Sequence, residues 1–185
     1  WTKQLIPKIG DTVYKICLGG IHSQESKLVV KSDDLMVLRN ADIASMYPSI
    51  ILELGLFPKS LGKEWLSVYR KIYQTRLKAK AEKNKVVDAG LKIALNGSYG
   101  KFGSMYSFLY APELMLTVTI TGQLMMLMLI EELESAGIRV VSSNTDGSGE
   151  SGDAIGKNAL KSNDIVSIDR HVVETNGGPG RVMAA

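Results

Sequence analysis

The feature that most constrains the fold is a pair of adjacent helical patterns joined by a very short connection. Over residues 64–83, apolar residues recur at helical spacing and leave the opposite face basic. These apolar positions are Trp65, Tyr69, Ile72, Tyr73 and Leu77. A turn at residues 83–85 leads into a second helical segment, residues 86–96. Because the connection is so short, we expect the two helices to form an antiparallel hairpin.

Strand patterns lie on both sides of this hairpin. Residues 13–30 alternate apolar and polar positions around Gly19-Gly20, which indicates strands joined by a tight turn. A short apolar run at residues 35–38 leads to Asp42, and a β-branched run at residues 138–142 leads into the turn 144–147. We expect this second turn to be the tip of a hairpin.

Two further helices complete the predicted set of elements. A short buried helix follows Pro48 and is closed by Gly55 and Pro58, and a long helix opens at Pro112 and stops near Gly137. The sequence therefore predicts a mixed α+β protein that contains a helical hairpin.

Composition narrows the classes of protein that the chain can represent. Its 185 residues, 45% hydrophobic and 22% charged, allow one domain of ordinary size. A single cysteine, Cys17, excludes an internal disulfide, and two distant histidines, His22 and His171, argue against a zinc centre. The cysteine count favours a reducing compartment, so we expect a cytoplasmic location. The most apolar stretch, residues 114–130, is interrupted by polar residues and indicates a buried helix, so we expect no membrane partner.

Two acidic residues are candidates for metal chemistry. Asp42 and Asp146 each follow a predicted strand and lie beside turn-forming residues. A sheet can hold such carboxylates rigidly while the turn exposes them, and two hard cations bound there would stabilise a phosphoryl group in transfer. The plainer alternative is that each aspartate only caps a turn.

The hairpin carries a second set of candidates. Lys92, Asn96 and Tyr99 lie at i, i+4 and i+7, on one face of the second helix, and Arg76 and Lys80 share a face of the first. Cations presented in this way suit a triphosphate, although most basic helix faces are simply solvated.

Three segments resemble signatures of the family B DNA polymerases. Residues 42–50 read Asp-Ile-Ala-Ser-Met-Tyr-Pro-Ser-Ile and resemble the first, Asp-x-x-Ser-Leu-Tyr-Pro-Ser-Ile. Residues 92–100 read Lys-Ile-Ala-Leu-Asn-Gly-Ser-Tyr-Gly and resemble the second, Lys-x-x-x-Asn-Ser-x-Tyr-Gly. Residues 143–147 read Ser-Asn-Thr-Asp-Gly and resemble a phage-like variant of the third, usually Asp-Thr-Asp-Ser. All three stand in the family's order.

The resemblance implies a fold and a reaction. The fold would be a polymerase palm, an antiparallel sheet backed by helices, with a short helical hairpin inserted as the fingers. The reaction would be template-directed DNA synthesis on a primer–template with deoxynucleoside triphosphates. Asp42 and Asp146 would hold two Mg²⁺ ions, for which Mn²⁺ is a possible substitute, and Ile43 would add a backbone carbonyl. The location implied is the cytoplasm of the host cell, if the parent is encoded by a phage.

By the same resemblance, the nucleotide meets residues from the first two signatures and the fingers. Tyr47 would pack beneath the incoming sugar and exclude a 2′-hydroxyl. Backbone amides near the start of the first helix and cations of the hairpin would bind the phosphates, and the last residues of the second signature would line the base-pair pocket. The nucleotide-binding residues implied are Ser45, Met46, Tyr47, Arg76, Lys80, Lys92, Asn96 and Tyr99.

The resemblance also implies a domain layout in which the exonuclease and thumb regions of the parent are missing. The segments are 1–40, strands leading into the palm; 41–62, palm with the first signature; 63–100, fingers hairpin; 101–147, palm helix and catalytic hairpin; 148–152, flexible linker; and 153–185, remaining palm and tail.

One departure from the family pattern keeps alternatives open. Asn144 stands where most relatives have the first aspartate of the third signature, and an amide brings no negative charge to a metal. The alternative is an inactive palm–fingers fragment that keeps the fold and at most binds nucleotide or nucleic acid. A reverse transcriptase or RNA polymerase would typically show Tyr-x-Asp-Asp or Gly-Asp-Asp at this turn, and the sequence does not.

Overall fold

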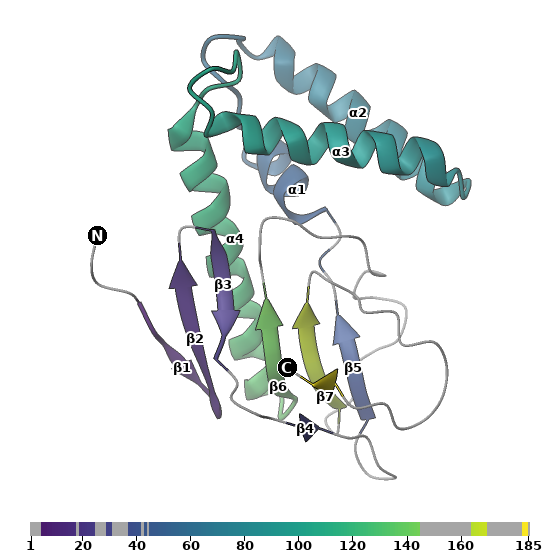
Figure 1. Ribbon diagram of the computed structural model, residues 1–185. Coiled ribbons are helices and arrows are strands. Elements are labelled where there is room, and N and C mark those ends of the chain that lie inside the picture. The colour runs from purple at the N-terminus through teal and green to yellow at the C-terminus, as the bar shows by residue number, and fades with distance from the viewer. Residues whose placement is uncertain are drawn as a thin grey trace. The chain divides into compact units, whose positions relative to one another are not determined.

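The chain divides into two compact units. The computed structural model describes residues 5–17, 19–24, 29–30, 37–41, 43, 45–144, 164–169 and 183–184. Unit 1 comprises Trp1–Ala44 and Gln123–Ala185, and unit 2 comprises Ser45–Gly122. Together they are mixed α+β, as predicted, with the helices α1–α4 and the strands β1–β8 shown in Figure 1.

Unit 2 is helical and contains the predicted hairpin. Helix α2 (Glu64–Ala81) and helix α3 (Lys85–Phe102) run side by side in opposite directions, which confirms the prediction (Figure 1). The turn between them places Lys83 at a positive φ of 58°, and Asn84 caps α3 by accepting a hydrogen bond from the amide of Val87 at 3.2 Å.

Helix α3 is longer than the sequence indicated, because it continues through Gly97 and Gly100 to Phe102. Each of these glycines disfavours a helix by about 1 kcal/mol relative to alanine. Buried Leu95 and Phe102, on either side of them, compensate for this cost through packing. A local signal for helix termination is overridden here by contacts distant in sequence.

The core of the hairpin is aromatic. Trp65 stacks on Tyr69, with ring centroids 4.7 Å apart, and lies 5.8 Å from the ring of Phe102. The buried Tyr69 hydroxyl donates to the backbone carbonyl of Leu95 at 3.1 Å. This bond ties α2 to α3, and burial raises the pKa of Tyr69 well above its ordinary value.

Unit 2 also contains helix α1 (Met46–Glu53), the short buried helix that the sequence predicts. It is linked to α2 twice. Ser49 and Tyr73 share a hydrogen bond of 3.2 Å, and Arg70 donates to the carbonyl of Leu52, in the last turn of α1, at 3.3 Å. The unit ends within helix α4 (Pro112–Ser135), whose second half belongs to unit 1.

Unit 1 is built on a six-stranded sheet in the order β1-β2-β3-β6-β7-β5. The strands are β1 (Lys8–Ile9), β2 (Thr12–Cys17), β3 (Gly20–Ser23), β5 (Val37–Ala41), β6 (Arg139–Asn144) and β7 (Asp164–Asp169). Cys17 pairs with Gly20, so β2 and β3 are joined by the predicted tight turn. A separate pair consists of β4 (Val29–Val30) and β8 (Met183–Ala184).

The prediction of an antiparallel sheet is correct for only part of it. Strands β1, β2, β3 and β6 pair antiparallel, whereas β7 pairs parallel with both β6 and β5. The next described strand after β6 therefore does not return beside it as a hairpin. The predicted hairpin tip at residues 144–147 lies, beyond Asn144, outside the described residues, as does the linker 148–152.

The long helix α4 ends at Ser135 and is followed by Gly137 at a positive φ of 78°, as the sequence predicted. By length and composition α4 could also cross a membrane, a test that core helices of soluble proteins pass equally well. Within unit 1 its second half contributes buried Met126, Ile130 and Leu133 to the core, and Gln123 donates to the carbonyl of Cys17 at 2.5 Å.

Candidate functional site

Within unit 2, two tyrosines from distant signatures lie in contact. The rings of Tyr47, from the first signature, and Tyr99, from the second, are 4.5 Å apart at their centroids and tilted by 43°. Only 2% of Tyr47 is exposed, while Tyr99 is half-buried. The hydroxyl of Tyr99 shares a hydrogen bond of 2.6 Å with Thr119 of α4, so the position of the second ring is fixed as well. The fold thus joins the two signatures through side chains.

A glycine that the sequence did not single out makes this packing possible. Gly122 is buried in the middle of α4, and a Cβ atom on it would lie 3.2 Å from both Met46 and Tyr47. A larger residue would push these side chains away, so the absence of a side chain lets α1 approach α4 closely. The only signal in the sequence is a glycine inside a long apolar helix, which is unfavourable without such a reason.

The start of α1 has an unusual backbone. Ser45 precedes the helix in the left-handed conformation, with φ 52° and ψ 40°, and its side chain does not cap the helix. Instead, Nη1 of Arg76 donates to the hydroxyl of Ser45 at 2.8 Å. A left-handed serine costs of order 1–2 kcal/mol, so this conformation requires such support.

Arg76, which the resemblance assigns to the nucleotide phosphates, is paired within the fold. It is 6% exposed, and its Nε donates to Oδ1 of Asp88 on α3 at 2.8 Å. A buried charge requires a partner, and Asp88 supplies it. Arg76 therefore joins α2, α3 and the start of α1, a role that helical spacing alone does not reveal. Lys80, one turn further along, is exposed as expected.

The second signature presents one half-buried face of α3. Lys92, Asn96 and Tyr99 are each partly exposed, whereas Gly97 and Gly100 lie on the exposed surface with open space around them. The predicted face is therefore formed. One of its members, Tyr99, contacts the buried ring of Tyr47.

In unit 1, the strands that precede the two candidate aspartates end at the same edge of the sheet. Strand β5 ends at Ala41, which pairs with Ile168 of β7, and Ser143 of β6 pairs with the same Ile168 from the other side. Because β5, β7 and β6 run parallel, their carboxyl ends lie together (Figure 1). Asp42 and Asp146 themselves lie outside the described residues, so their proximity stays a prediction.

Asn144 is the last residue of β6 and pairs with His22 of β3. Its side-chain oxygen is buried, and among the described residues it has no hydrogen-bond partner. A carbonyl oxygen of this kind is a suitable ligand for a hard cation or acceptor for water. Ile43, whose backbone carbonyl the resemblance assigns to the metals, is half-buried and lies outside any helix or strand.

Over the part of the chain that the structure describes, no three side chains of His, Cys, Asp or Glu gather as a metal site. Both predicted carboxylate ligands lie outside that part, so the metal site stays a prediction. No family model, curated protein or solved structure matches the chain.

Proposed function

We propose that the chain carries the palm and fingers of a family B DNA polymerase and adds deoxynucleotides to a primer 3′-hydroxyl. The observation that carries the proposal is the contact between Tyr47 and Tyr99, at 4.5 Å. The first two signatures were identified independently along the sequence, and a shared nucleotide site requires them to meet. A chance resemblance gives no reason for the two tyrosines to lie together.

In this proposal Tyr47 selects the sugar. Its packing against Tyr99 and beside Gly122 holds the ring in one position, and discrimination by exclusion needs a rigid wall. A deoxynucleotide fits beside the ring, whereas the 2′-hydroxyl of a ribonucleotide collides with it. Asn96 and Tyr99 line the pocket for the new base pair.

The phosphates are bound by Lys92 and Lys80 together with the backbone amides of Ser45 and Met46. Arg76 acts as a positioning residue, because its bond to Ser45 supports the left-handed turn that directs these amides. Its own charge is compensated by Asp88, so we assign Arg76 no direct contact with the phosphates.

Asp42, Asp146 and the carbonyl of Ile43 would hold two Mg²⁺ ions, with the side-chain oxygen of Asn144 as a further oxygen donor. The common edge of β5 and β6 fits this assignment, since it brings the residues before both aspartates into one row of the sheet. Bound there, the metals would activate the primer hydroxyl and neutralise charge on the phosphates.

Primer extension with deoxynucleotides and Mg²⁺ tests this function. We expect extension by the natural chain and a loss of roughly 1,000-fold in the Asp146→Ala variant, since a principal metal ligand is removed. Asp11→Ala is the matched control, because Asp11 is exposed and lies 3.9 Å from its only described ion-pair partner, Arg139. Equal extension by all three proteins would exclude the assigned role of Asp146. Nucleotide binding without extension by any of them would favour the inactive fragment.

A further inference from the structure

The outer face of α2 carries an open hollow that the proposed nucleotide site does not use. It is lined by Lys63, Leu66, Ser67, Arg70, Lys71 and Gln74. The polar members recur at i, i+4, i+7, i+8 and i+11 from Lys63, which places them on one face of the helix. The buried residues Tyr69 and Arg76 lie on the opposite face, toward α3.

The charge of this hollow is uncompensated. Three of its residues are cationic and none is acidic. Among the described residues, neither Lys63, Arg70 nor Lys71 forms an ion pair, and Arg70 only donates to the carbonyl of Leu52. Ser67 and Gln74 add neutral donors. Uncompensated cations with neutral donors between them are suited to a row of phosphates.

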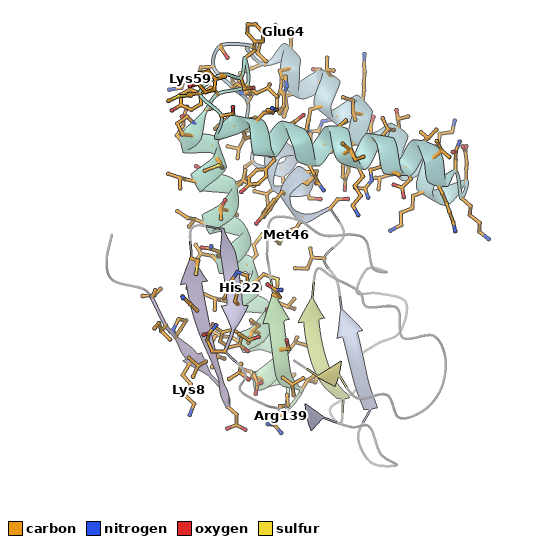
Figure 2. The ribbon with its side chains drawn as sticks, viewed as in Figure 1. Lys8, His22, Met46, Lys59, Glu64 and Arg139 are labelled. Atoms are coloured by element: carbon orange, nitrogen blue, oxygen red, sulfur yellow. The ribbon has the colours of Figure 1, made fainter. Side chains whose placement is uncertain are left out.

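The loop between α3 and α4 adds exposed aromatic rings close to the start of α2. Tyr106 and Phe108 are 92% and 91% exposed. Their loop is nonetheless ordered by hydrogen bonds, from Ala111 to the carbonyl of Phe102 at 2.9 Å and from Ser60 to that of Phe108 at 3.1 Å. Ser60 lies in the loop between Lys59 and Glu64, both labelled in Figure 2, so its bond to Phe108 brings the backbone of the aromatic loop beside the start of α2, where Lys63 begins the hollow.

We propose that the hollow and the aromatic loop bind single-stranded nucleic acid, phosphates in the hollow and a base stacked on Phe108. A cationic groove beside aromatic side chains is the usual construction of such sites, because every base offers a flat face and every linkage a charge. An acidic protein segment would satisfy the cations but would leave two almost fully exposed rings without flat partners.

The test is binding of fluorescein-labelled oligothymidylate, measured by anisotropy at several salt concentrations without nucleotide or Mg²⁺. The Lys63→Gln/Lys71→Gln variant should make the slope of log K against log salt shallower by about 1.4. At 0.1 M salt this corresponds to a loss of affinity on the order of 25-fold. The Lys78→Gln/Lys85→Gln variant makes the same change in charge outside the hollow and should remain within twofold of the natural chain.

A separate variant tests the stacking of a base on Phe108. Phe108→Ala should weaken binding about tenfold and leave the salt slope unchanged, because stacking releases no counterions. Val86→Ala, which shortens an 83% exposed apolar side chain on α3, is the control and should have no effect.

Equal salt slopes in the two double variants would overturn the proposal, since binding would then follow net charge alone. So would the absence of oligonucleotide binding, or binding of poly-glutamate with the same dependence on Lys63 and Phe108. Because no nucleotide is added, the result is independent of whether the chain polymerises.

Discussion

In unit 2, side-chain contacts join the segments of the candidate site, whereas in unit 1 strand pairing aligns them. Tyr47 meets Tyr99 ring to ring, and Arg76 bonds to both Ser45 and Asp88. In the sheet, Ala41 and Ser143 are brought into one row by register with Ile168. The proposed nucleotide face therefore depends on a few side chains and can be altered by single substitutions, while the proposed metal edge depends on strand pairing.

If a few side chains hold unit 2 together, removing the buried arginine should have the largest effect on its stability. Arg76→Met should lower the free energy of unfolding by about 3 kcal/mol, because it leaves Asp88 without its partner and Ser45 without support. Urea unfolding followed by Trp65 fluorescence, in a Trp1→Phe background, reports on this unit. Lys80→Met, on the exposed surface, should remain within about 0.5 kcal/mol. Equal effects of the two variants would contradict the structural role of Arg76.

Two glycines, one on a packed helix face and one on an open face, test how closely α1 approaches α4. Gly122→Ala should destabilise by about 1 kcal/mol, since overpacking against Tyr47 outweighs the gain in helix propensity. Gly97→Ala, in open space on α3, should stabilise by about 0.5–1 kcal/mol. The same unfolding measurement applies to both. Stabilisation of similar size in the two variants would show that α1 does not approach α4 as described.

The smallest expected effect concerns the bond between α2 and α3. Because burial raises the pKa of Tyr69, the folded state retains the hydroxyl proton after the unfolded chain loses it, near pH 10. The resulting stability is complete below that pH and falls as pH rises further. Tyr69→Phe should cost about 1 kcal/mol at pH 8, and its deficit should shrink above pH 10. The measurement is the free energy of unfolding of the natural chain and of Tyr69→Phe from pH 8 to above pH 10. A constant difference between the two proteins over this range would contradict this account.

Local patterns in the sequence predicted the elements better than their pairing. The hairpin, the short α1 and the strand before Asp42 all follow from spacing and turn residues. The parallel placement of β7 does not, because strand order depends on contacts distant in sequence.

For the candidate site too, local spacing predicted some features, and contacts distant in sequence determined the others. Helical spacing grouped Lys92, Asn96 and Tyr99 correctly on one face. It also grouped Arg76 with Lys80 as a cation for phosphates, because spacing cannot show that Asp88 on the neighbouring helix would pair with Arg76. Gly122 was missed since its role depends on how closely Tyr47 approaches it.

Insertion of a single deoxynucleotide or ribonucleotide by the natural chain and by Tyr47→Ala tests the central claim most directly. The claim is that Tyr47, fixed by Tyr99, forms the wall of a nucleotide site. We predict that the natural chain strongly prefers the deoxynucleotide and that Tyr47→Ala lowers this preference at least roughly 100-fold, about 2.7 kcal/mol. Tyr99→Phe keeps the ring and should preserve the preference. Unchanged discrimination in Tyr47→Ala, with insertion still proceeding, would contradict the account.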